Sequence, residues 1–218
     1  MVYWARMVSG MSSEFASFYV TDQFIGTCCA TKVEDRRVII VDPFFMRQCA
    51  ETVCDRLLAT RREAYSGLSP KSNWRLDGAQ ARMSREDVAG IEWLLAESVA
   101  FHEWAHHAFR HTETTNQTTT QSDSVFNELA ADAYAAYLTG SRHVQSTPKG
   151  VVRTPSVAQE VVIEFFCSIS GIYDTSHPDA MKRMTLVRDF FSRGLRDGVP
   201  PGAEHLPSVD DVRRYLGE

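Results

Sequence analysis

The pattern of apolar and polar residues changes partway along this chain of 218 residues. Three short runs rich in β-branched and aromatic residues predict β-strands at 15–20, 24–30 and 36–42. From 44–64 onward, apolar residues instead recur at helical spacing. The chain therefore predicts an α+β fold, with a small N-terminal β-sheet packed on a mostly helical part.

The strongest helical pattern begins after Ser84, which can cap a helix, and Asp87 three residues later completes a capping box. The pattern continues through VAGIEWLLAESVAFHEWAHHAFRH without a proline. Apolar residues lie nearly all round this helix rather than on one side of it. We therefore expect a central helix that is largely buried.

Polar, low-complexity sequence follows at 112–124 and predicts a mobile loop, because such residues cannot form a packed core. Further helical patterns predict helices at 125–138, 157–171 and 178–193. Ser208 precedes a short last helix.

These elements fit a single domain over 1–218, with the sheet and first helix in about 15–83 and a helical part in about 84–218. Hydrophobic residues make up 44% and charged residues 23% of the chain, which is typical of a globular protein. The net charge of −5 offers no basic surface, so we expect no nucleic-acid partner.

The cysteines and the longest apolar runs bear on where the protein works. Five cysteines occur, two of them adjacent at Cys28-Cys29, and none in a CxxC pair, which predicts reduced thiols. No apolar run is long enough to cross a bilayer, and the first residues do not form a convincing signal peptide. We therefore expect a cytoplasmic protein with no transmembrane segment.

His102 and His106 are four residues apart in the central helix, in the pattern His-Glu-x-x-His. This spacing places both imidazoles on one face, about one turn apart, where two nitrogens can bind one metal ion. Glu103 follows the first histidine and could act as a general base on a metal-bound water. A catalytic zinc site needs one more protein ligand.

The predicted helix at 125–138 offers that ligand. Glu128 and Asp132 lie four residues apart among small apolar residues, so both carboxylates are on a face built to pack. Buried carboxylates need a partner. Zn²⁺ would provide one for Glu128, and the free N–H of a ligating histidine would provide one for Asp132.

The segments HEWAHH and NELAAD together resemble the gluzincin metallopeptidases, of the thermolysin type and the HtpX/CaaX-prenyl-protease type. The resemblance covers roughly 97–190 and implies a zincin-like metallopeptidase domain. It also implies that His102, His106 and Glu128 bind Zn²⁺, that Glu103 is the general base, and that Asp132 orients the first histidine.

A third segment, Ser176-His177-Pro178 with Arg183 six residues after the histidine, is similar to an STHP-x4-R segment of the HtpX type. The chain is thus most similar to soluble HtpX-like, minigluzincin-like domains. The resemblance implies that His177 lies near the active site, where it could donate to an oxyanion, and that Arg183 contacts His177 or the second helix. Alternatively, Ser-His-Pro only starts a helix.

The function predicted from the sequence is that of a zinc-dependent endopeptidase acting on a peptide or protein substrate through a metal-activated water. One alternative is a catalytically silent zinc-bearing regulatory or interaction domain. Another is a deformylase-like hydrolase, which would use a cysteine as third ligand; here the cysteines lie far upstream or, as Cys167, in an apolar run.

Overall fold

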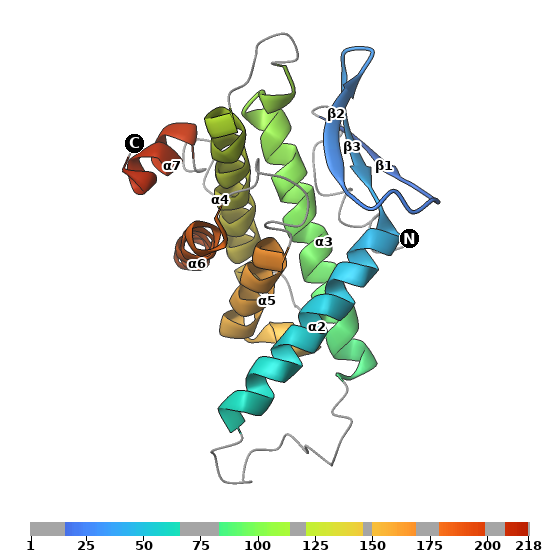
Figure 1. Cartoon of the computed structure of the whole chain (residues 1–218), viewed down its shortest axis with the longest axis vertical. Coiled ribbons are helices and arrows are strands. Elements are labelled where there is room, and N and C mark those ends of the chain that lie inside the picture. Colours follow the sequence, from blue (N-terminus) through green and yellow to red (C-terminus); the bar gives the residue numbers. More distant parts are fainter. Residues whose placement is uncertain are drawn as a thin grey trace.

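The computed structural model describes residues 16–65, 83–113, 121–145, 150–168, 179–198 and 208–217. A small sheet precedes the helices along the chain, so the predicted α+β class is confirmed. In Figure 1 the long helix α3 (Arg85–Ala108) runs between the sheet on one side and the helices that follow it in the chain on the opposite side. It contacts two strands and three helices, which makes it the centre of the fold: β2 (Cys29–Val33), β3 (Arg36–Val41), α2 (Pro43–Tyr65), α4 (Gln121–Gln145) and α5 (Pro155–Ser168).

The sheet has the strand order β1-β3-β2, with β1 (Ser17–Val20) parallel and β2 (Cys29–Val33) antiparallel to β3 (Arg36–Val41). A two-residue turn, Glu34-Asp35, joins β2 to β3 with φ angles of 48° and 65°. Positive φ at both central residues matches the twist that a tight hairpin requires.

The second strand lies later in the chain than the prediction of 24–30, which was wrong over its first five residues. The reason is Asp42, whose buried carboxylate accepts hydrogen bonds from the N–H groups of Ile25 and Gly26 at 2.7 and 2.9 Å. Its other oxygen accepts from Phe44 and Phe45 at the start of the next helix. These bonds hold the chain before Cys29 as a loop instead of a strand.

The helix α2 (Pro43–Tyr65) follows this carboxylate, and α3 begins at the predicted capping box of Ser84 and Asp87, which is confirmed. The apolar residues of α3 are buried nearly all round, as its pattern predicts. The short 3₁₀ helix η1 (His111–Glu113) follows the end of α3.

The helix α4 (Gln121–Gln145) is longer at both ends than the predicted 125–138. It takes in the last residues of the segment predicted as a mobile loop, whose residues 114–120 lie outside the described part of the chain. At its other end, α4 continues past Gly140, where a β-carbon would overlap the backbone carbonyl of Phe191 in α6 (Ala180–Asp197). That glycine therefore permits a close helix approach and does not end the helix.

The remaining helices are α5 (Pro155–Ser168) and α7 (Val209–Leu216), with a 3₁₀ turn, η2 (Gly150–Arg153), before α5. The helix predicted at 157–171 begins slightly earlier, at Pro155, and its predicted end lies outside the described residues. The helix predicted at 178–193 begins and ends later, because Asp179 caps α6 and Gly198 ends it. Of the helices that the structure describes, none combines the length and the apolar character needed to cross a membrane. The five cysteines are free thiols.

Candidate metal centre

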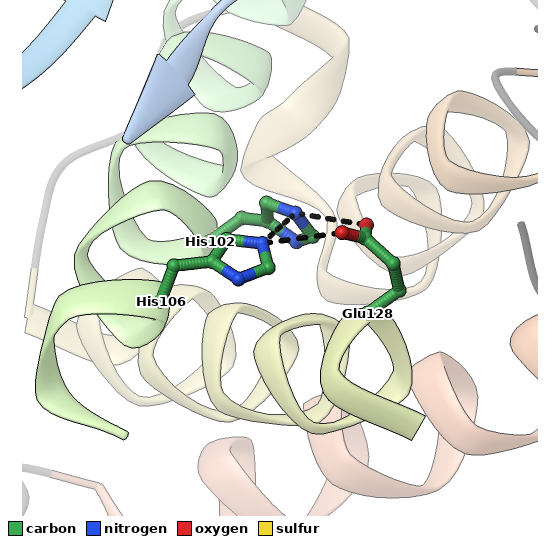
Figure 2. Close-up of side chains that lie close together, drawn as sticks. All are labelled: His102, His106 and Glu128. Carbon is green, nitrogen blue, oxygen red and sulfur yellow. Dashed lines mark hydrogen bonds and ion pairs between the residues drawn. The ribbon is translucent and has the colours of Figure 1, made fainter. Parts of the chain in front are cut away.

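The two histidines of the His-Glu-x-x-His pattern lie one turn apart on α3 and point in the same direction (Figure 2). Their Nε2 atoms are 3.1 Å apart, and their ring planes cross at 76°. His102 is 7% exposed, so its ring is almost entirely enclosed by protein. The helical spacing alone brings these two nitrogens to one point.

Glu128 reaches the same point from α4, which packs against α3 (Figure 2). Its Oε2 lies 3.4 Å from His102 Nε2, and its Oε1 lies 3.5 Å from His106 Nε2. One ligand atom from each of the three residues falls within 4.8 Å of the others. The structure thus forms a candidate metal site of two histidines and one carboxylate, from the three residues that the sequence singled out.

The second nitrogen of His102 faces away from this site. Its Nδ1 lies 3.0 Å from Oδ1 of Asp132, one turn beyond Glu128 on α4. Asp132 is completely buried. A carboxylate in this position favours a proton on Nδ1, which leaves the Nε2 lone pair of His102 directed at the site.

Arg183 of α6 completes the enclosure of this carboxylate. Its Nη2 donates to Oδ1 of Asp132 at 3.0 Å, its Nε donates to Oδ2, and its Nη2 lies 3.7 Å from Glu128 Oε2. The guanidinium is fully buried and lies over the ring of Phe166. Arg183 thus contacts the second metal-site helix, one of the two positions expected for it, whereas His177 lies outside the described residues.

Glu103 is 7% exposed and lines the same cleft as the three candidate ligands. Burial raises the pKa of its carboxyl, nearby His102 partly opposes this, and the pKa reaches about 7. A group with a pKa near neutrality can both take up and release a proton at physiological pH. Glu103 therefore has the chemistry of an acid–base group.

The same residues have strongly shifted pKa values. Burial lowers the pKa of His102, but the carboxylates of Asp132 and Glu128 raise it more, to about 10. Burial and the charge of His102 lower the pKa of His106 to about 3. Burial raises the pKa of Glu128, but the hydrogen bond and charge of His102 hold it well below its usual range. Such a concentration of shifted groups in one cleft is typical of functional sites.

The cleft lies between the sheet and the helices. The strand β2 at the edge of the sheet lines it on one side, and Phe165 and Phe166 of α5 line it on the other. The ring of Phe166 lies 5.7 Å from that of His102. The cleft therefore joins the edge strand β2, an apolar wall and the candidate metal site.

Two further histidines, which follow the His-Glu-x-x-His pattern, also make structural contacts. His107 is buried, and its Nε2 lies 3.0 Å from the carbonyl oxygen of Val38 in β3, which ties α3 to the sheet. His111 lies at the cleft with its Nδ1 3.0 Å from Nδ1 of His106. Neither contact follows from helical periodicity, because one partner is in the sheet and the other lies beyond the helix end.

Comparisons with known proteins place this site in a family context. A family model described as peptidase U49 matches residues 52–198, which include both site helices, α5 and α6. Neither the comparison with curated proteins nor the comparison with solved structures found a significant match.

Proposed function

Because the chain belongs to the peptidase U49 family, we propose that it is a zinc-dependent endopeptidase of the gluzincin type, with His102, His106 and Glu128 as the metal ligands. The observation that carries this proposal is the meeting of two histidines and one glutamate in a cleft beside a buried glutamate. Two histidines and one glutamate are a known ligand set of catalytic zinc, with the fourth position left for water or substrate.

The distances fit a tetrahedral ion of the size of Zn²⁺. Ligand atoms about 2.0–2.1 Å from a tetrahedral ion lie roughly 3.3–3.4 Å from one another. The three pairs here are separated by 3.1, 3.4 and 3.5 Å. A metal ion bound by all three side chains would also explain why His102, His106 and Glu128 lie so close together. In its absence their pKa values are shifted in opposite directions.

Zn²⁺ bound there would polarise the substrate carbonyl and lower the pKa of a bound water molecule. Glu103 accepts the proton of the attacking water and returns it to the leaving amine, for which a pKa of about 7 is suited. Asp132 holds the ring of His102, and Arg183 holds Asp132. The predicted role of His177 as an oxyanion donor stays a prediction.

The site offers a carboxylate as third ligand, which favours the gluzincin type over a deformylase-like centre with a cysteine. The edge of β2 could receive an extended peptide along the cleft, which supports a peptide or protein substrate.

The test compares zinc content with proteolysis of a denatured protein substrate, with and without a chelator. Glu103→Gln should retain zinc and lose at least about 10²-fold in turnover, because it removes only the acid–base group. His102→Ala, His106→Ala and Glu128→Ala should each lose zinc as well. The exposed Glu86→Gln on the same helix is the matched control and should behave as wild type. Full activity of Glu103→Gln would contradict the mechanism, and zinc retention in Glu128→Ala would contradict the gluzincin ligand set.

A wild-type protein that binds zinc but cleaves no substrate in a mixed peptide pool would instead favour the catalytically silent regulatory domain. The two functions share the metal site and differ only in turnover, so the pair of measurements separates them.

A further inference from the structure

His111 is brought back against the metal site by a sharp reversal of the chain. Helix α3 ends at Ala108, and Arg110 adopts a positive φ of 61°, which few non-glycine residues adopt. The ring of His111 then lies 5.1 Å from that of His106, edge to face at 67°. The two histidines are five positions apart, so an uninterrupted helix would not bring them together on one face.

The contact joins the two rings through one atom of each. Nδ1 of His106 and Nδ1 of His111 are 3.0 Å apart, a hydrogen-bond distance. The other nitrogen of His106, Nε2, faces His102 and Glu128. A neutral imidazole that gives the Nε2 lone pair to a metal carries its proton on Nδ1. His106 is then the donor in this hydrogen bond and His111 the acceptor.

We propose that His111 is a positioning residue of the metal centre: its Nδ1 accepts a hydrogen bond from His106 Nδ1–H and so holds His106 with Nε2 directed at the metal. The proposal rests on the proposed function, because it concerns the same metal. His111 acts on the metal only through His106. Its contact is on the edge of the His106 ring opposite the ligand atoms, and it is not among the residues whose ligand atoms cluster.

The two histidine ligands are therefore held by different chemistry. His102 Nδ1 lies 3.0 Å from the buried carboxylate of Asp132, whereas His106 Nδ1 meets a second imidazole. A carboxylate partner makes a ligating imidazole more basic, and a neutral imidazole does so less. The carboxylate of Asp132 thus lies behind His102, and an imidazole lies behind His106.

A second side-chain contact, between Thr112 and His107, holds the segment that carries His111. Thr112 Oγ1 lies 3.1 Å from Nδ1 of His107, and His107 Nε2 lies 3.0 Å from the carbonyl oxygen of Val38. Because a carbonyl can only accept, Nε2 of His107 carries its proton, so Nδ1 accepts from the threonine hydroxyl. Through His107, η1 is anchored to both α3 and β3. Such support from packed elements lets a positioning residue fix its partner.

The test measures zinc affinity of the full-length protein by competition with a chromophoric chelator. His111→Phe keeps a ring but has no acceptor, and should weaken zinc binding about 10–100-fold. In His111→Asn, Oδ1 takes nearly the position of Nδ1, so affinity should return to within a fewfold of wild type. The exposed Glu86→Gln on α3 is the matched control and should bind zinc as wild type does.

A second readout follows the His106 tautomer by ¹⁵N NMR of the zinc-loaded protein, where wild type should carry the proton on Nδ1. Wild-type zinc affinity in His111→Phe would overturn the inference while leaving the proposed function intact. Equal loss in His111→Asn and His106→Ala would also overturn it, because a ligand role for His111 would explain that result. Absence of zinc binding in wild type would overturn the proposed function itself.

Discussion

The guanidinium of Arg183 is buried against the carboxylate of Asp132, and this ion pair links α6 to the helix that carries Glu128. Both side chains are fully enclosed. Removing both charges from water costs several kcal/mol, which the contact and its two hydrogen bonds must offset. The intact pair therefore contributes little net stability, but the loss of either member would leave the other charge buried without its partner.

Replacing Arg183 with methionine should destabilise the protein by about 3–5 kcal/mol, because it leaves Asp132 buried without its guanidinium. The measurement is the free energy of unfolding in urea. The exposed Arg214→Met, which removes a surface pair with Asp211, should cost less than about 1 kcal/mol.

The double variant Arg183→Met with Asp132→Asn shows whether the cost of Arg183→Met comes from the unpaired charge or from lost packing. Removal of both charges should cost less than the sum of the two single changes, since no uncompensated charge remains. Strict additivity would argue that the ion pair is not energetically coupled.

The single change Asp132→Asn should weaken zinc binding about 10–100-fold, since it replaces the negative charge behind His102 Nδ1 with a neutral amide of the same shape. Zinc titration in the presence of a competing chelator measures the effect. The exposed Asp210→Asn on α7 serves as the matched control. Unchanged affinity would mean that the carboxylate serves only its pair with Arg183.

Helical spacing in the sequence predicted the parts of the candidate site that lie on one face of a single helix. The spacing of His102 and His106, the spacing of Glu128 and Asp132, and the capping box at Ser84 all follow from helical geometry. The pairing of the two helices was inferred from the need for a third ligand and for partners of the buried carboxylates, and also from the resemblance, which pointed to Arg183 as well.

Contacts that depend on a chain reversal or on another layer were not predictable in this way. His111 reaches His106 only because Arg110 adopts a positive φ, and His107 meets a strand 69 residues earlier. The second strand was misplaced because hydrogen bonds to Asp42, and not local β-propensity, decide the conformation of the loop before it. Tertiary partners, invisible in the local pattern, determine each of these.

The crossing of α4 and α6 depends on glycines, and Gly194→Ala should disrupt it. A β-carbon at this position would overlap the carbonyl oxygen of Tyr137 in α4, and backbone atoms cannot move aside cheaply. Overpacking of this kind costs about 1–3 kcal/mol or more, even though alanine is the better helix former. Thermal unfolding measures the change, and the exposed Arg188→Ala on α6 should shift stability by less than about 0.5 kcal/mol. A stabilised Gly194→Ala would show that the helices separate at little cost.

The pH dependence of stability should be shaped by Glu97, a buried carboxyl of α3 that the proposed chemistry does not use. Its Oε1 lies 3.0 Å from Nε of Arg142 on α4, and its Oε2 has no hydrogen-bond partner among the described residues. Burial raises the pKa of Glu97 from 4.5 to about 7, although the charge of Arg142 opposes the shift. Between these two values the folded protein holds a proton that the unfolded chain releases.

Stability contributed by this proton is therefore present below about pH 4.5 and is lost as the pH rises to about 7, with an upper limit of roughly 3 kcal/mol. Glu97→Gln mimics the protonated carboxyl, so it should be more stable than wild type at pH 8 and nearly equal to it at pH 4.5. Arg142→Met should extend the loss to higher pH, because it removes the charge that favours the carboxylate and so raises the pKa of Glu97 further. The comparison uses urea unfolding of the three proteins across this range. Parallel curves for wild type and Glu97→Gln would mean that the pKa of Glu97 is the same in the folded and unfolded protein, with Arg142 compensating for its burial.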